Sequence, residues 1–364
     1  MPLTQRFSIA LLSASSITLA LCAAFALHLE RPYWAGIAAM VLSQSEQGQS
    51  LEKGIWRMVG TVAGALAGMA VLARFGESRA ALLVACGVSL ALLVVLMHGS
   101  RYAYFYYSTA LMLVLVAAQS HSEAPFRIAV ARMQENLVGI AAYTLCALCL
   151  RPHSAAREFH RLPAFGRGVF RELADHFDPT ILRGKLRAGA AAFLQLALLT
   201  ALWQNLPDAP GSLFIEIGAL LILLGAMTGH FAAWSLIAAF AVGIPAALWL
   251  YGVLPRLAGW EELAALTFAA AFSMAWILPR PEQGMARMGV LMPVFVLSGL
   301  GGEVFGPESM LNGAAGLLCA ALAVSLIFQM THGPDVPGSS GGTPAVRHGR
   351  LARSARHEGG GHAA

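Results

Sequence analysis

The residues best suited to chemistry in this chain are two basic side chains four positions apart, Lys53 and Arg57. At that spacing they share one face of a helix. Arg57 falls a full turn inside a segment with the composition of a membrane span, where a charge needs a partner or water. A guanidinium can hold a carboxylate through two parallel hydrogen bonds. The pair therefore predicts a site for an organic anion, with anchoring of the helix to the membrane surface as the alternative.

Aromatic and amide side chains precede this pair. Tyr33 and Trp34 open a short apolar run, and Gln44 lies in the polar turn 43–50 that ends it. The rings can stack on an aromatic anion and the amide can donate a hydrogen bond, so all three residues are candidates for substrate binding. An aromatic belt at the membrane interface is the alternative for the rings, and a cap or solvated turn for the glutamine. A second aromatic run, 102–107, is expected to form such a belt, with stacking on the substrate as the alternative.

One acidic residue, Glu216, interrupts the apolar run 212–229. A carboxyl group desolvated there can bind and release a proton near neutral pH, so we expect Glu216 to couple transport to protons. The alternative is a shallow carboxylate that reaches headgroup water or pairs with an arginine. Glu135, by contrast, follows Arg132 by one helical turn and is expected to form a local ion pair.

Small residues follow the basic pair at close to four-residue spacing: Gly60, Thr61, Gly64 and Gly68. Such residues let two helix backbones approach closely, which is the main packing device in lipid. We therefore expect this face to pack against another helix.

The composition is that of an integral membrane protein. Of its 364 residues, 57% are hydrophobic and only 12% are charged, whereas a soluble domain carries about 25% charged residues. No phosphate-binding loop, metalloprotease motif or nucleophile elbow is present in the sequence. Cys146 and Cys149 lie in an apolar run and are interpreted as packing residues. The sequence thus predicts no enzyme, no cofactor, no metal site and no nucleic-acid partner.

The apolar runs predict an all-α integral membrane protein with about 12 transmembrane helices in two six-helix repeats. The expected organisation is a first membrane half over 1–150, a short basic cytoplasmic link over 151–186, a second half over 187–330 and a disordered tail over 331–364. Whether 33–50 spans or re-enters stays open. With the N-terminus inside, this count places most of the 24 Lys and Arg residues in cytoplasmic segments, as the positive-inside rule requires. Both termini are therefore expected in the cytoplasm.

One stretch of about 40 residues resembles the signature of the FUSC (fusaric acid resistance) proteins, which belong with the aromatic acid exporters. The matching positions are Pro32-Tyr33-Trp34-Ala35, Gln44, Gly48, Lys53, Arg57, Gly60-Thr61 and Gly64. Ser45 replaces the proline that usually follows the glutamine, and the link is far shorter than the cytoplasmic domain of the large exporters.

The resemblance implies an exporter of aromatic carboxylic acids in the bacterial inner membrane. Such proteins work with a periplasmic adaptor (membrane-fusion) protein, are thought to run on the proton gradient, and confer resistance to their substrates. Plant malate channels are distant relatives, so a passive organic-anion channel is one alternative. A non-transporting membrane scaffold that presents its basic link is another. Substrate, direction of transport and homo-oligomeric state are left open by the sequence.

Overall fold

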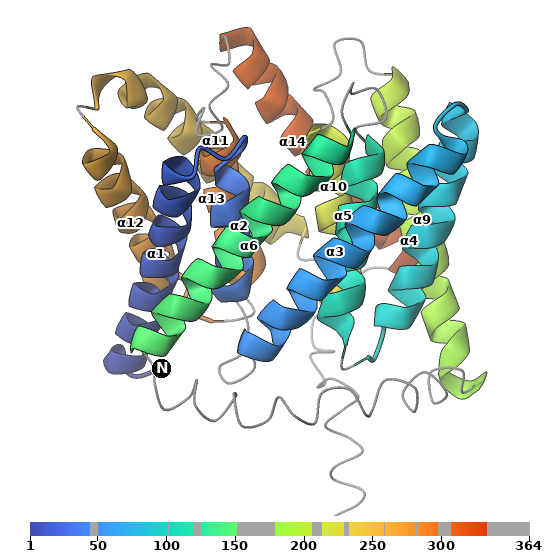
Figure 1. Ribbon diagram of the computed structural model, residues 1–364, viewed down its shortest axis with the longest axis horizontal. Helices are drawn as coiled ribbons and strands as arrows, with labels where there is room; N and C mark the ends of the chain where they lie inside the picture. The colour runs from blue at the N-terminus through green and yellow to red at the C-terminus, as the bar shows by residue number, and fades with distance from the viewer. Residues whose placement is uncertain are drawn as a thin grey trace, which may run out of the picture.

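The computed structural model is helical throughout its regular segments (Figure 1). It describes residues 1–43, 50–100, 102–118, 125–150, 179–205, 213–228, 233–257, 259–280, 283–297 and 307–332. Within these ranges there are twelve α-helices, one short 3₁₀ turn and no strand. The helices are α1 (Leu3–Ala26), α2 (Tyr33–Ser43), α3 (Ser50–Phe75), α4 (Arg79–Met97), α5 (Ala103–Ala118), α6 (Pro125–Leu150), α9 (Pro179–Asn205), α10 (Leu213–Thr228), α11 (Ala233–Val253), α12 (Trp260–Ile277), α13 (Gly284–Leu297) and α14 (Pro307–His332).

Seven helices of the described ranges are long and apolar enough to cross a membrane, namely α1, α3, α4, α6, α9, α11 and α14. Several of them present large apolar side chains outward in a stripe. On α4 the stripe is Val84, Val88 and Leu92, all more than half exposed. Residues at this spacing lie on one helix face, and an apolar face of this extent is stable against lipid rather than water. The chain is therefore a multi-pass membrane protein, which confirms the all-α expectation.

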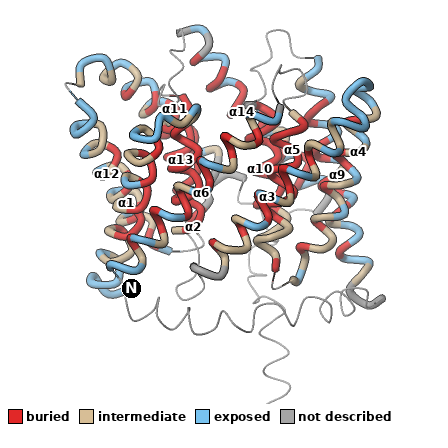
Figure 2. The backbone as a smooth tube through the Cα atoms, viewed as in Figure 1, coloured by how far each residue is buried: buried red, intermediate tan, exposed pale blue. Residues whose placement is uncertain are grey.

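Four shorter apolar helices, α2, α5, α10 and α13, lie in the interior (Figure 2). Every residue of α2 from Tyr33 to Leu42 is buried, and so is every residue of α10 from Phe214 to Gly225. A helix buried all round must be surrounded by other helices. The 11 residues of α2 extend about 16 Å, roughly half of a hydrocarbon core of about 30 Å. Helix α2 alone does not span, and 44–49 lie outside the described residues.

The helices pack in pairs, some within one half of the chain and some between the two halves. Helix α3 packs along α5, and α11 packs along α13. Helix α1 packs against α12, and α4 packs against α9. The short helices also meet, because α5 contacts α10 and α2 contacts α13. The first six and last six helices thus share one interior rather than forming separate bundles.

Glycines allow the closest of these approaches. A Cβ atom added at Gly60 or Gly64 would collide with backbone carbonyls of α5, and one at Gly68 would collide with the side chain of Val116. The Thr61 hydroxyl donates to the Arg57 carbonyl at 2.8 Å and so stays within α3. On α11, a Cβ atom at Gly243 would collide with the backbone of α13. Backbone contact in lipid is stabilised by this fit of small residues.

The predicted boundaries of the link and the tail fall either inside a helix or outside the described residues. Helix α9 begins at Pro179, inside the segment expected to be a link, and 151–178 lie outside the described residues. The expected tail is described only as far as His332, the last residue of α14. The division into a first half, a link, a second half and a tail therefore stays a prediction.

Candidate functional site

Arg57 lies inside the protein, in the second turn of α3, and is 2% exposed. Its Nη2 donates to Oδ1 of Asn136 on α6 over 3.4 Å. Its Nη1 is buried and has no hydrogen-bond partner. Among the described residues, no carboxylate forms an ion pair with Arg57. A guanidinium buried in this way holds hydrogen-bonding capacity that no group of the described chain uses.

A second buried arginine, on α6, has its charge balanced by a carboxylate. On α6, Arg132 Nη1 donates to Glu135 Oε2 at 2.6 Å, and both side chains are buried. The other oxygen of Glu135 accepts from the backbone N–H of Arg31 at 2.8 Å. The Arg132 guanidinium also lies over the Trp34 ring, 5.0 Å from its centroid. This contact pattern fixes the start of α2 against the middle of α6 and confirms the predicted Arg132–Glu135 ion pair.

Asn136 joins the two arginines. Its Nδ2 donates to the carbonyl of Arg132 at 3.0 Å, while its Oδ1 accepts from Arg57. The amide is 8% exposed and is held on both sides, so its orientation is determined by the network. Arg57, Asn136, Arg132 and Glu135 thus form one buried polar network. It connects α3 with α6, and its Arg132 also contacts Trp34 of α2.

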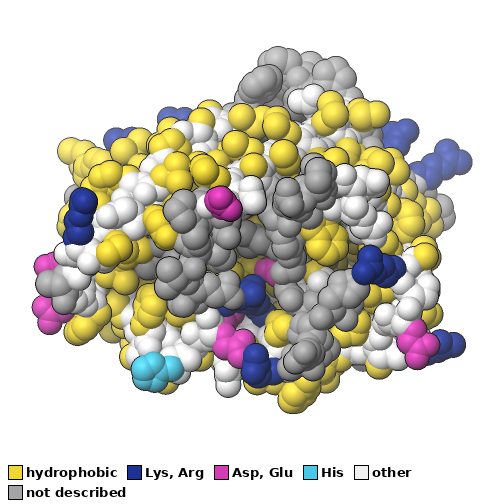
Figure 3. Space-filling view, turned by 90° about the horizontal axis from the view of Figure 1, so that it is seen from above, with side chains coloured by type: hydrophobic (Ala, Val, Ile, Leu, Met, Phe, Trp, Pro, Cys, Tyr) yellow, Lys and Arg dark blue, Asp and Glu magenta, His cyan; other side chains and the backbone are white. Residues whose placement is uncertain are grey.

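The network reaches the second half of the chain at α10. Tyr33 is close enough to Arg132 and to Glu216 to interact electrostatically with both. Glu216, in the first turn of α10, is 0% exposed. The predicted coupling residue is thus a buried carboxyl group beside the network and not one exposed to headgroup water. The other alternative, pairing with an arginine, stays open, and so does the coupling role. Seen from above, basic and acidic side chains lie together near the middle of the molecule (Figure 3).

Two tyrosines of α5 flank Arg57. Tyr104 and Tyr107 both lie within its electrostatic range, and their ring centroids are 6.3 Å apart. Nζ of Lys53, the other predicted basic residue, lies 5.2 Å from the centroid of the Tyr104 ring. Lys53 and Arg57 therefore share an aromatic surface on α5. Tyr107 is fully buried, so it differs from the interface belt expected for the run 102–107.

Buried polar atoms without a hydrogen-bond partner occur in this region. Besides Arg57 Nη1, the indole N–H of Trp34 and the hydroxyl of Tyr107 are buried and have no hydrogen-bond partner. Buried polar groups are normally satisfied, and each exception needs an explanation. The unsatisfied hydroxyl of Tyr107 beside the uncompensated guanidinium of Arg57 is suited to the oxygens of an anion.

The structure brings together most, but not all, of the residues predicted from the sequence. Tyr33, Trp34, Arg57 and Glu216 belong to one buried region, and Lys53 lies beside it on α3. The two rings are core residues and not members of an interface belt. Gln44 lies outside the described residues.

Three members of the site were not assigned to it from the sequence: Asn136, Tyr104 and Tyr107. Asn136 had one signal, its position four residues after Arg132 on the same helix face. Nothing in the sequence indicates that Asn136 contacts Arg57, 79 residues away.

The fold and this network define a class of protein: a multi-pass membrane protein of the transporter type, with charged groups in its interior. A sequence model of the fusaric acid resistance protein family matches residues 7–198, which is more than half of the chain. The chain belongs to this family, FUSC, whose members are membrane transport proteins and not enzymes. No curated protein and no solved structure matches the chain.

Proposed function

We propose that this protein exports small organic acids, most of all aromatic carboxylic acids, across the bacterial inner membrane. The observation that carries the proposal is the buried guanidinium of Arg57, which has no ion-pair partner among the described residues and lies beside the unsatisfied hydroxyl of Tyr107. A charge inside the membrane is costly and marks a substrate or ion pathway. A carboxylate would neutralise Arg57, and its ring would stack on the neighbouring tyrosines.

The substrate-binding residues of this proposal are Tyr33, Trp34, Gln44, Lys53 and Arg57. The guanidinium holds the carboxylate, and Lys53 draws the anion toward it from the start of α3. Tyr104 and Tyr107 extend the predicted aromatic surface. Because Arg57 is closed off from solvent in this conformation, substrate reaches it only when helices move apart.

An arrangement in two six-helix repeats supplies such a motion. In each half the second and fifth helices are short, α2 and α5 in the first half and α10 and α13 in the second. The packing partners correspond as well: α3 with α5 matches α11 with α13, and α1 with α12 matches α9 with α4. Transporters built from repeats alternate access by rocking one half against the other around a central site.

Glu216 is the proposed proton-coupling residue. It lies in the second half of the chain, yet Tyr33 of the first half is within its electrostatic range. Protonation of Glu216 would change the charge of the network by one unit, which alters its affinity for an anion. Proton entry would then be linked to substrate release.

The proposed setting follows from the family. Both termini lie in the cytoplasm, and a periplasmic adaptor protein carries the substrate onward, so that cells become resistant to it. In Figure 1 the N-terminus lies on the same side as the end of α6, which is consistent with an even number of crossings before the link.

The test is efflux of a labelled hydroxybenzoate from cells with and without the full-length protein, before and after collapse of the proton gradient. Gradient-dependent loss of label from expressing cells only is the expected result. Equal loss from both strains would contradict export of this substrate class. Flux that follows voltage and survives Glu216→Gln would identify a passive anion channel instead.

A further inference from the structure

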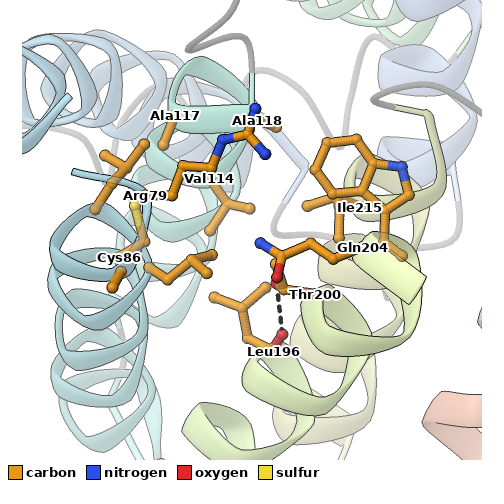
Figure 4. Close-up of a pocket in the computed structure, with 13 residues that line it drawn as sticks. Arg79, Cys86, Val114, Ala117, Ala118, Leu196, Thr200, Gln204 and Ile215 are labelled. Atoms are coloured by element: carbon orange, nitrogen blue, oxygen red, sulfur yellow. Dashed lines mark hydrogen bonds between the residues drawn. The ribbon is translucent and has the colours of Figure 1, made fainter. Parts of the chain in front are cut away.

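A cavity of about 620 Å³ lies apart from the network, between α4 and α5 on one side and α9 and α10 on the other. This volume is in the range of small-molecule sites, about 300–1,000 Å³. Leu83, Cys86 and Ile215 contribute to an apolar wall. Figure 4 shows Arg79 and Gln204 reaching into the space between α4 and α9. Both are exposed, whereas Cys86 and Ile215 are buried, so the cavity has a polar mouth and an apolar floor.

The polar groups at the mouth are donors whose capacity is not used. In the described part of the chain, Arg79 makes neither a hydrogen bond nor an ion pair with its side chain. Gln204, the other polar side chain at the mouth, is exposed and offers an amide N–H beside it. An unpaired cation beside an apolar wall matches a ligand with an anionic head and an apolar body.

A second cavity of similar size, about 580 Å³, shows what Arg79 adds. It lies between α1 and α12, which pack together as α4 and α9 do. Its lining includes Cys22, Trp260 and Thr267 but no charged side chain. An apolar molecule would fit either cavity. Only the cavity beside Arg79, of these two, can select a negative charge.

We propose that the cavity between α4 and α9 binds an amphipathic monocarboxylate. The carboxylate contacts Arg79 and Gln204, and the apolar body lies against Leu83 and Ile215. Ile215 directly precedes Glu216, so α10 separates this cavity from the buried network. The inference rests on the proposed function for the choice of an acid as ligand, and it places a second binding site for that acid at the side of the protein.

The test uses the full-length protein in nanodiscs of zwitterionic phospholipid and the photoreactive aromatic acid 4-benzoylbenzoate. Cross-linked peptides are mapped by mass spectrometry. We expect labels within 79–86 and 196–204. Arg79→Gln should weaken labelling about fivefold, because an exposed charge pair contributes modestly, and Leu83→Trp should abolish it by filling the cavity. Arg74→Gln and Val84→Trp, an exposed charge on α3 and a bulky group on the outer face of α4, are matched controls that should keep full labelling.

Competition identifies the source of the natural ligand. Suppression of labelling by hydroxybenzoate indicates that the natural ligand is a water-soluble aromatic acid. Suppression by oleate indicates a fatty acid from the bilayer. Either result supports the site. Labelling that neither acid suppresses, or that persists in Arg79→Gln and Leu83→Trp, overturns the proposal. This binding result is independent of efflux, so a cavity that binds in a protein that does not export would separate this inference from the proposed function.

Discussion

Arg132 and Glu135 form an ion pair in which both side chains are shielded from solvent. Such a pair has a large effect when only one partner is removed, because the other is left as an uncompensated buried charge. The surrounding groups, Trp34 and the backbone N–H of Arg31, depend on the pair for their positions. Its first role is therefore to hold α2 against α6.

We predict that Arg132→Met lowers the free energy of unfolding by about 3 kcal/mol. The double variant Arg132→Met with Glu135→Gln should recover much of this loss, since it leaves no charge behind. Denaturation of the purified protein in detergent, analysed as a double-mutant cycle, measures the coupling. Additive effects of the two changes would contradict an ion pair.

At this scale the sequence predicted local partners well and distant ones poorly. The pairing of Arg132 with Glu135 follows from their separation along one helix. The contact of Arg57 with Asn136 depends on how α3 crosses α6, which no local pattern encodes. The burial of Tyr33 and Trp34 was likewise open, because aromatic residues occur both in cores and at membrane interfaces.

At the scale of elements, the contact between α3 and α5 depends on glycine. The missing side chains at Gly60 and Gly64 let the two backbones approach, and this brings Tyr104 and Tyr107 to Arg57. Packing and site geometry are therefore linked through one helix pair.

Gly64→Ala should lower stability by about 1–3 kcal/mol, because its Cβ atom would collide with the backbone of α5. Gly252→Ala on α11 is the control, since nothing lies within 4 Å of its Cβ position. That change should be neutral or stabilising. Thermal denaturation of both variants in the same detergent compares them, and equal effects would argue against close contact at Gly64.

Helix existence could be predicted from apolar runs, but helix ends could not. The apolar run that ends the predicted first half belongs to a helix that begins at Pro125. Its first turns look polar because they carry Arg127, Arg132 and Glu135, of which the last two compensate each other inside the fold. Basic residues at the start of α9 concealed its true beginning in the same way.

At the scale of the whole molecule, α4 and α9 form one of the contacts between the two halves of the chain. A Cβ atom at Gly189 would lie 2.7 Å from Cγ2 of Val95. Such proximity across halves could not be predicted, because hydropathy gives the order of spans and not their neighbours.

The pair Val95→Cys with Gly189→Cys should form a disulfide on mild oxidation, because a Cβ atom at Gly189 would lie 2.7 Å from Cγ2 of Val95. That Cβ atom would also lie 2.8 Å from the Ala91 carbonyl oxygen, so α9 must shift slightly to take it. If transport requires the halves to move, this cross-link should stop efflux and a reductant should restore it. Val84→Cys with Gly189→Cys is the control, with Val84 on the lipid-facing side, and should not cross-link. Full efflux in the cross-linked protein would contradict rocking at this interface.

The central claim is that Arg57 binds the carboxylate of the substrate, and one comparison tests it directly. Efflux of labelled hydroxybenzoate is measured in proteoliposomes with a proton gradient, for the wild-type protein, Arg57→Gln and the exposed control Arg74→Gln, each inserted at the same level. We predict that Arg57→Gln lowers the rate of efflux at least about tenfold, because a buried charge-assisted contact is removed. Arg74→Gln should show normal efflux. Normal efflux by Arg57→Gln would contradict the central claim.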